Sequence, residues 1–328
     1  MRSNSKEEGG ILVLVLLVVA LVLSIGVQAV DRLHLTFNQA VKTLKDDQSY
    51  WYALGLESTA SNLLTRHKEE KDFFKPLILD SNVPLIRFNL NETVIEGSLK
   101  DLSSCFNLNS LVQLDNKGSM LVANNQGLVL YRNLLSSLEI DSFKIENLIY
   151  GLLDWIDSDD SLINNYGAED DFYTRKDNPY LTANQLLSNE SELANIKNYN
   201  NNILKKILPY VCVLPKPGLS RMNINAISID KPEILMMLFG QGLTRESALQ
   251  VLGDRPSEGY LVIDDFLSHS ALKGLVDSRL VKSYLALDSS YYLLNSKIIS
   301  KDYSFVMNSS LELLGSGDVQ VFKRELMF

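Results

Sequence analysis

The sequence predicts an α+β protein in which a long N-terminal helix packs on a small antiparallel sheet, with a large, mainly helical domain inserted in the sheet. Three patterns predict this class. Proline is absent between Met1 and Lys75, and apolar residues there recur at helical spacing. Short β-prone runs lie near both ends of the remaining chain. Helical periodicity dominates the stretch between them, so the helical part is an insertion into one sheet.

One continuous helix is expected from about Ile11 to about Arg66, because the helix propensities of these residues allow it. Its first part, 11–30, would lie in a membrane, and its second part, 31–68, would pack on the soluble domain. The packing stripe is expected to comprise Leu33, Phe37, Ala40, Val41, Leu44, Tyr52, Leu56, Ala60, Leu63 and Leu64.

The soluble part divides into a sheet domain made of 69–106 and 287–328 and an inserted helical domain at 107–286. Gly315 and Gly317 fit a hairpin turn between two of the strands. Strands are expected at 77–79, 85–88, 93–95, 291–294, 305–307, 311–314 and 319–322. Helices are expected at 127–138, 144–156, 190–208, 231–239, 245–252 and 271–286.

Composition excludes several classes of protein. The chain has 328 residues, of which 46% are apolar and 22% charged, which excludes a disordered chain, a collagen and a polytopic membrane protein. Lys and Arg number 31 against 40 Asp and Glu, and a net charge of −9 disfavours nucleic-acid binding. Two Cys and three His exclude a Cys₄ zinc site and a His-rich metal cage. Neither a P-loop nor a G-x-S-x-G or H-E-x-x-H motif occurs, so we expect no enzymatic activity.

The N-terminal segment contains the targeting signal of the protein. Residues 11–30 carry no charge and are long enough to cross a hydrocarbon core about 30 Å thick. Three interpretations compete: a secretory signal cut after Ala29, a plain signal anchor, and a prepilin-type leader cut after Gly10 with the helix retained. The polar segment 1–10 ends in Gly9 and Gly10 directly before Ile11, which favours the prepilin-type leader.

Eight acidic residues lie between 154 and 177, at a density where like charges repel. One interpretation is a solvated acidic loop. The other is a Ca²⁺ site, because this cation takes six to eight oxygen ligands in flexible loops. Asp157 and Asp159 would then place two carboxylates at a helix end, and Glu169 and Asp170 would close the loop from the other side. The spacing is not that of an EF-hand.

The two cysteines, Cys105 and Cys212, leave two interpretations open. They form one disulfide if the soluble part lies outside the cytoplasm, or they are buried free thiols.

A third pattern, at 219–267, is similar to a helix–hairpin–helix, in which a glycine-containing turn can present backbone amides to phosphate. Residues 219–286 hold seven basic and eight acidic residues, so a structural helical hairpin is favoured.

Together these residues resemble one family, the K-type minor pseudopilins of the bacterial type II secretion system. The resemblance runs along nearly the whole chain and depends on the order and spacing of short motifs. Besides the leader and apolar helix they are 48–55 with Glu57, 105–109, 154–159, 167–170, 178–180 with Asn184, 191–193, 208–210, 213–215 and 223–225.

The resemblance implies a pilin-like fold, cleavage after Gly10 by the prepilin peptidase and N-methylation of Ile11. It also implies structural calcium in the region of Asp157, Asp159, Glu169 and Asp170. The chain departs from the family in a less basic leader, where Glu7 and Glu8 offset Arg2 and Lys6, and in Ile11 as first mature residue.

Val15 stands where most pilin-like subunits carry a glutamate that pairs with the N-terminal amine of a neighbour. An unpaired acidic side chain in hydrocarbon costs roughly 2.5 kcal/mol or more, and valine avoids that cost. The subunit that can best lack this carboxylate is one with no neighbour above it. We therefore expect a non-enzymatic subunit at the pseudopilus tip, capping and initiating its assembly.

The expected partners are the I- and J-type minor pseudopilins, the prepilin peptidase and the inner-membrane assembly platform, and no nucleic acid. The expected location is the inner membrane, crossed once, with the soluble domain in the periplasm. Two alternatives remain: a membrane-anchored helix–hairpin–helix DNA-uptake receptor, and a periplasmic enzyme released by cleavage after Ala29.

Overall fold

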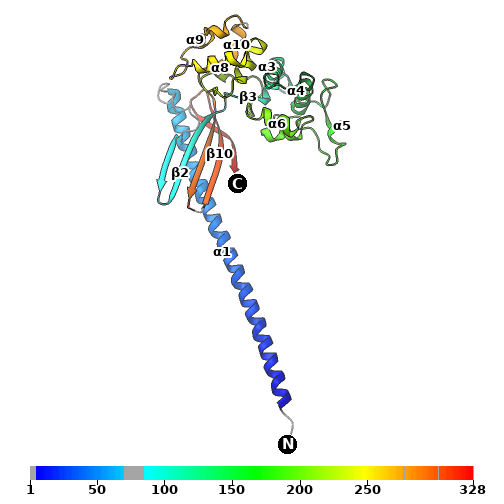
Figure 1. The fold of residues 1–328 in the computed structure, drawn as a ribbon, viewed down its shortest axis with the longest axis vertical. Coiled ribbons are helices and arrows are strands. Elements are labelled where there is room, and N and C mark those ends of the chain that lie inside the picture. Colours follow the sequence, from blue (N-terminus) through cyan, green and yellow to red (C-terminus); the bar gives the residue numbers. More distant parts are fainter. Residues whose placement is uncertain (1–4, 70–84, 276–277, 302, 328) are drawn as a thin grey trace.

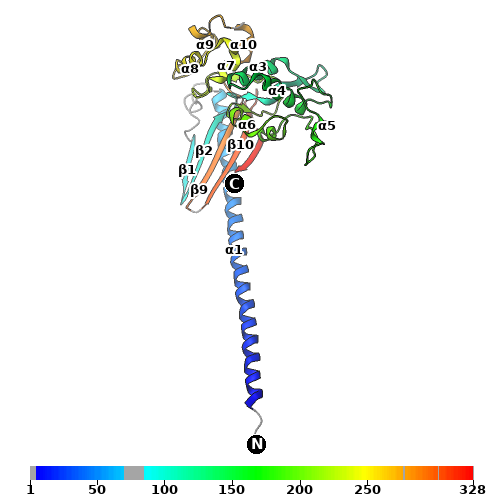
Figure 2. The ribbon, with the colours of Figure 1, turned by 45° about the vertical axis from the view of Figure 1, so that its right-hand side comes forward.

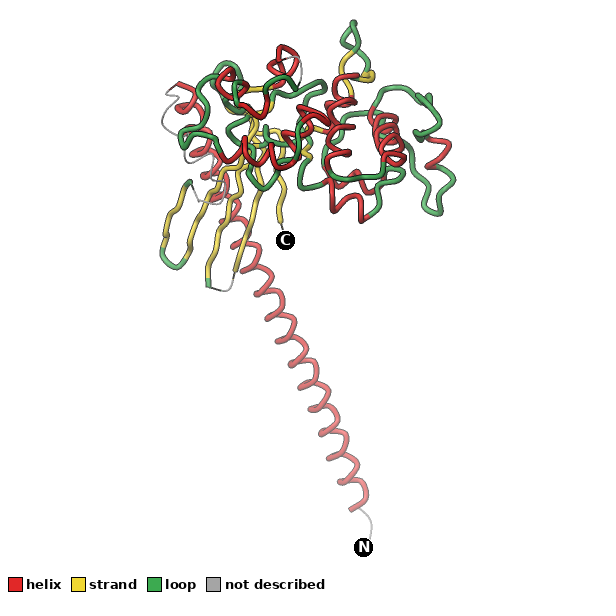
Figure 3. Tube along the Cα trace, turned by 45° about the horizontal axis from the view of Figure 1, so that its top comes forward, coloured by secondary structure: helices red, strands yellow, loops and turns green. Residues whose placement is uncertain are grey.

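The computed structural model describes residues 5–69, 85–275, 278–301 and 303–327. One long helix forms a rod, and a head made of a sheet and a helical domain sits at the end remote from the N-terminus (Figure 1). The sheet lies along the last part of the rod. The helical domain spreads over the end of the sheet and reaches past it to one side (Figures 2 and 3).

The rod is helix α1 (Ser5–Glu69), which is unbroken over 65 residues as the absence of proline predicts. Packing on the head begins later than predicted, because Leu33, Phe37 and Leu44 remain 69%, 67% and 68% exposed. The buried apolar side chains follow at spacings of three and four residues, which place them on one face of the helix. They are Ala53, Leu56, Ala60 and Leu64.

The head contains a five-stranded antiparallel sheet with the order β1-β2-β9-β10-β11. Its strands are β1 (Ile86–Leu90), β2 (Thr93–Asp101), β9 (Tyr291–Ser300), β10 (Tyr303–Leu313) and β11 (Val319–Met327). Strands β2 and β9 are neighbours although the whole helical domain separates them in sequence, so that domain is an insertion as predicted. It begins after Asp101, before the expected boundary at 106.

The strand predictions differ from the structure in one place within the described residues. The runs at 305–307 and 311–314 belong to one strand, β10, because Ser309 and Ser310 also pair with β9 and β11. The run at 77–79 lies outside the described residues.

Helix α1 packs on the sheet through apolar side chains and one ion pair whose carboxylate is buried. Leu56 meets Gly97 of β2, where an added Cβ would lie 3.3 Å from the leucine Cδ2 atom. Burying Leu56 stabilises the fold by about 2 kcal/mol. The buried Glu57 carboxylate accepts hydrogen bonds from Arg324 Nε and Nη2, at 2.8 and 2.9 Å, and from the Ser309 hydroxyl at 2.6 Å. The ion pair therefore joins α1 to the last strand.

The insertion has its own apolar core, around Tyr131, Ile149 and Leu235. Its elements are β3 (Phe106–Asn107), β4 (Val112–Leu114), β5 (Leu121–Ala123), α3 (Asn125–Ser137), α4 (Ser142–Ile156), α5 (Asp170–Tyr173), α6 (Asn201–Ile207), β6 (Val211–Cys212), β7 (Met222–Asn223), α7 (Glu233–Phe239), α8 (Arg245–Gly253), α9 (Ile263–Leu267), α10 (Ser278–Tyr284) and β8 (Leu285–Ala286).

Two predicted helices are divided in the structure. The stretch 190–208 splits into a 3₁₀ helix, Glu190–Asn195, and α6, because Asn198 has a φ of 72° and the Asn200 side chain caps a new helix. The stretch 271–286 splits into a 3₁₀ helix, Ser270–Leu272, then α10 and the short strand β8. Apolar periodicity alone does not show these breaks.

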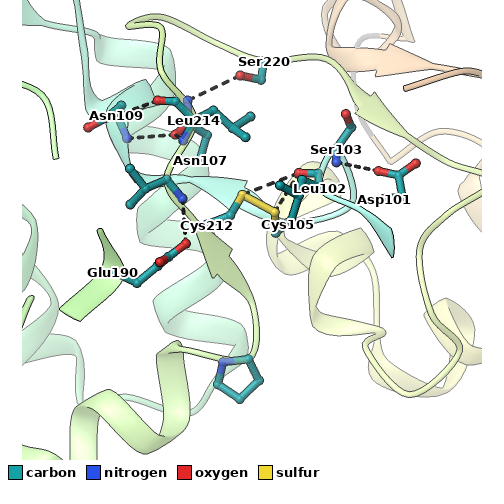
Figure 4. Close-up of a disulfide and its surroundings, with 12 residues drawn as sticks. Asp101, Leu102, Ser103, Cys105, Asn107, Asn109, Glu190, Cys212, Leu214 and Ser220 are labelled. Carbon is teal, nitrogen blue, oxygen red and sulfur yellow. Dashed lines mark hydrogen bonds between the residues drawn. A yellow bond between two sulfur atoms is a disulfide. The ribbon is translucent and has the colours of Figure 1, made fainter. Parts of the chain in front are cut away.

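A disulfide joins Cys105 to Cys212, with Cα atoms 5.8 Å apart (Figure 4). It lies at the parallel pairing of β3 with β6, where Asn107 is opposite Cys212. Leu214, Tyr291 and Phe322 form a small apolar cluster with the bridge. Because Tyr291 and Phe322 belong to β9 and β11, the disulfide lies where the insertion meets the sheet.

The buried carboxyl of Asp101 also joins the sheet to the insertion. It accepts hydrogen bonds from the backbone amide of Ser103, the Asn223 side chain and the Ser289 hydroxyl (Figure 4 shows the first). Burial raises the pKa of Asp101 from 3.8 to about 6, although these hydrogen bonds lower it. The folded protein therefore binds this proton more tightly than the unfolded chain does.

This raised pKa predicts a pH dependence of stability. Asp101 contributes most to the free energy of unfolding below pH 4, and that contribution falls as the pH rises through about 6. Relative to that of the parent chain, the free energy of unfolding of Asp101→Asn should rise by about 2–3 kcal/mol between pH 4 and pH 7. Urea denaturation across this range measures the difference, with the exposed Glu258→Gln as control. A pH-independent difference would contradict the prediction.

Candidate functional site

An acidic cluster lies where α4 ends. Most side chains of this helix are buried, including Leu152, Leu153 and Ile156, and two carboxylates are buried with them. Asp154 is fully buried, and Asp157, which ends the helix, is 3% exposed. Three residues apart, they lie on the same side of the helix end.

Glu169 brings a third buried carboxylate, from the residue that precedes α5. The chain can approach so closely only because residue 167 is glycine. A Cβ added to Gly167 would lie 1.8 Å from Asp154 Oδ2. The segment from Gly167 to Glu169 therefore lies directly against the Asp154 carboxylate.

These carboxylates lack the partners that buried charges normally have. Both oxygens of Asp154, both of Glu169 and Oδ1 of Asp157 are buried without a hydrogen bond, and so is the amide oxygen of Asn184. The backbone amides of Ile163 and Ala168 lower the pKa of Asp154, although neither amide forms a hydrogen bond with its carboxylate oxygens.

Burial and mutual repulsion both favour the protonated carboxyls. Loss of water raises the pKa of Asp154 to about 6, that of Asp157 to about 7 and that of Glu169 to about 8. Repulsion between the carboxylates is the next cause for Asp157 and Glu169. A cation placed among them would offset both effects, because its charge favours the ionised carboxylates.

The structure brings two of the four predicted ligands into this cluster, Asp157 and Glu169. Asp159 is exposed and caps the backbone amide of Ser161, at 2.9 Å. Asp170 accepts hydrogen bonds from the amide and hydroxyl of Thr182, at 2.8 and 2.7 Å. Within the described residues, no group of three or more His, Cys, Asp or Glu side chains is already arranged around a metal position.

Sequence reasoning missed Asp154 as a member of the cluster. Its three-residue spacing from Asp157 on a predicted helix was a usable signal, since it places both carboxylates on one side. The contribution of Asn184 had no such signal, because only the folded loop buries its amide oxygen.

The N-terminal part of α1 is a second candidate site. Of the described helices, one is long and apolar enough to cross a membrane, and it is α1 from Gly10 onward. The predicted cleavage position, between Gly10 and Ile11, lies inside this continuous helix. Val15 is exposed on the helix, so its side chain is free to contact lipid or another helix.

Comparison with known proteins decides the family. Models described as "Type II secretion system (T2SS), protein K" match residues 104–216 and 222–288. The type II secretion system protein K of Pectobacterium carotovorum subsp. carotovorum is 30% identical over 322 residues, which cover 98% of this chain and 97% of that relative. Its counterpart in Klebsiella pneumoniae is 30% identical over 312 residues, covering 95% and 94%. The chain belongs to the type II secretion system protein K family.

The structural comparison agrees with the sequence comparison. A chain in the crystal structure of the GspK–GspI–GspJ complex from the enterotoxigenic Escherichia coli type 2 secretion system superposes with a TM-score of 0.73 and 25% identity. The superposition covers 88% of this chain and 99% of that one. The predicted α+β, pilin-like fold and the assignment as a minor pseudopilin are therefore confirmed.

Family membership also decides between the alternatives for 219–267. Residues 222–288 match the pseudopilin family, and no comparison supports a DNA-uptake receptor. In this minor pseudopilin α3 contacts the turn after α7: Asn133 donates a hydrogen bond to the Met237 carbonyl, and its Nδ2 lies 3.5 Å from an added Gly240 Cβ. The pattern is thus a packed helical hairpin.

Proposed function

We propose that this minor pseudopilin occupies the tip of the pseudopilus, where it initiates assembly and caps the fibre. The insertion carries this proposal, because it spreads over the end of the sheet that is remote from the membrane helix and projects beyond it (Figure 2). A subunit stacked above would meet this domain. Val15 supports the same position, because a subunit with none above it has no neighbour's amine to neutralise.

The proposal includes partners and location. Helix α1 and the pilin-like sheet would join the I- and J-type minor pseudopilins, and a similar chain is part of a GspK–GspI–GspJ complex. The prepilin peptidase would cut after Gly10, Ile11 would be N-methylated, and the inner-membrane platform would draw the subunit from the membrane. The head would lie in the periplasm and act by assembly, without catalysis and without binding nucleic acid.

The tip position is tested by Val15→Glu, with Val15→Leu as an apolar control. Glutamate can neutralise the amine of a neighbouring subunit, whereas the insertion still opposes a subunit stacked above. We therefore expect Val15→Glu to change the number or length of the fibres, while the leucine variant assembles like the parent chain and both label one end. Electron microscopy of gold-labelled fibres measures the position and the assembly. Labels of the parent chain along the shaft would contradict the tip position, and assembly unchanged by Val15→Glu would remove the support that Val15 gives to it.

Processing is tested by mass spectrometry of the mature N-terminus. A methylated Ile11 is the expected result. A mature chain that begins at Val30 would contradict retention of the helix and would favour a released periplasmic protein.

We further propose that the acidic cluster binds a structural calcium ion. Asp154, Asp157 and Glu169 would hold it, with the amide oxygen of Asn184, because these are hard oxygen ligands that lack other partners. Bound calcium would offset most of the negative charge of the three buried carboxylates and join α4 to the loop before α5. Asp159 stays a candidate, because its charge acts on both Asp154 and Asp157.

Calcium is expected to raise the unfolding midpoint of the head, because binding to the folded state alone adds about 2.7 kcal/mol at a hundredfold excess over Kd. Gly167→Ala should abolish this gain, since its Cβ would displace the Asp154 carboxylate. Gly55→Ala is the matched control, at an exposed helical position with nothing within 4 Å. Thermal unfolding in calcium and in EDTA measures the gain, and equal midpoints for the parent chain would contradict the proposal.

A further inference from the structure

Lys197 connects the two halves of the acidic cluster. Its backbone carbonyl lies against α4 at Gly151, where an added Cβ would be 3.4 Å from the oxygen. Gly151 precedes Asp154 by three residues, so Lys197 is seated on the helix that carries Asp154 and Asp157. The first half of the cluster and the lysine backbone therefore share one support.

The rest of Lys197 reaches the second half of the cluster, the segment around Glu169. Its ammonium donates a hydrogen bond to the Gly167 carbonyl at 2.9 Å and lies 4.9 Å from the centre of the Phe172 ring. Its backbone amide donates to the Tyr173 hydroxyl at 3.2 Å. These contacts lie on both sides of Glu169, so one residue holds both ends of the segment that carries this carboxylate.

The direction of the ammonium decides what Lys197 does. Its hydrogen bond goes to a neutral carbonyl, and its cation–π contact goes to a ring, so both contacts orient the chain and leave the carboxylate oxygens unpaired. A lysine that simply neutralised the acids would donate to them directly. The unpaired carboxylates remain available to a metal.

We propose that Lys197 is a positioning residue for calcium, which holds Gly167 and Glu169 against α4 so that Asp154, Asp157 and Glu169 can share one ion. The inference rests on the calcium site proposed above. Residues that orient metal ligands without touching the metal change affinity by about 10–100-fold when they are replaced.

Calcium titration of the full chain in detergent, by isothermal calorimetry, tests this role. Lys197→Met should weaken calcium binding about 10-fold, because it loses the contacts to Gly167 and Phe172. Lys197→Arg should restore the affinity to within about threefold, since a guanidinium can donate to a carbonyl and stack on a ring. Lys205→Met, at an exposed position on α6, should leave the affinity unchanged.

A site-specific readout separates positioning from general destabilisation. Trp155 lies between the two α4 carboxylates in sequence, and its ring is 5.2 Å from that of Tyr173, which Lys197 contacts. In a Trp51→Phe background Trp155 is the only tryptophan of the chain. We expect calcium to shift its emission, and Lys197→Met to require about 10-fold more calcium for the same shift. Phe172→Leu keeps the lysine hydrogen bond and should cause a smaller loss.

Unchanged affinity in Lys197→Met would overturn the inference. Tighter binding would overturn it too, because Lys197 would then act only as a charge that repels the ion. Failure of arginine to restore binding would also count against positioning. If the parent chain itself binds no calcium, both the calcium site and this role of Lys197 are wrong. If the parent chain binds calcium and Lys197→Met binds it equally well, the calcium site is correct and only the role of Lys197 is wrong.

Discussion

Replacing Cys105 and Cys212 together by alanine is expected to lower the free energy of unfolding by about 2–5 kcal/mol. The disulfide closes a loop between residues 107 positions apart, so reduction greatly increases the freedom of the unfolded chain. It also lies within the apolar cluster of Leu214, Tyr291 and Phe322, where the insertion meets the sheet. Loss of the bridge should therefore loosen the junction as well as the insertion.

Chemical denaturation of the full chain in detergent, followed by near-ultraviolet circular dichroism, measures this loss. The parent chain treated with a reductant should show the same destabilisation as the double variant, and the variant should not respond to reductant. A variant that unfolds at the same denaturant concentration as the oxidised parent would contradict the prediction.

Arg324→Met is expected to destabilise the head by about 3 kcal/mol, because it leaves the Glu57 carboxylate buried without its cation. The Glu57 side chain is only 6% exposed, whereas the Arg324 side chain is 43% exposed. Water can therefore not replace the lost hydrogen bonds of the Glu57 carboxylate. The Ser309 hydroxyl alone remains to donate to it among the contacts described above. Helix α1 should then separate more easily from β11.

The double variant Glu57→Gln/Arg324→Met should recover part of that loss, since no buried charge remains. Lys144→Met is the matched control, because its ion pair with Asp141 is exposed on both sides and should contribute less than about 0.5 kcal/mol. Equal destabilisation by Arg324→Met and Lys144→Met, in the same denaturation experiment, would contradict this prediction for the Glu57–Arg324 pair.

Local periodicity explains why much of the fold was predictable. The stripe at Leu56, Ala60 and Leu64 is visible at helical spacing, and the β-prone runs at both ends of the soluble part indicate one sheet with an insertion. The same apolar spacing wrongly predicted that Leu33, Phe37 and Leu44 pack on the soluble domain, because these side chains are exposed in the single chain. Periodicity identifies a face that can be buried and does not say by what.

The acidic cluster could not be predicted from local sequence patterns alone. The run of carboxylates near 154–177 is obvious in the sequence, yet its members have different fates in the fold. Asp170 is paired with Thr182, whereas Asp154 is buried with neither oxygen hydrogen-bonded. Gly167 and Lys197 matter only because distant segments meet α4, and nothing in their immediate sequence indicates that contact.

The amino-acid sequence by itself determined the membrane-length helix, the absence of a carboxylate at Val15, the sheet interrupted by a helical domain, and the family. These properties depend on residue type and spacing along the chain. Only the tertiary structure decided which carboxylates lose water, that Glu57 meets Arg324, and that Asp154 joins Asp157 and Glu169. Desolvation depends on what packs around a group from elsewhere in the chain, and spacing along the sequence does not contain that information.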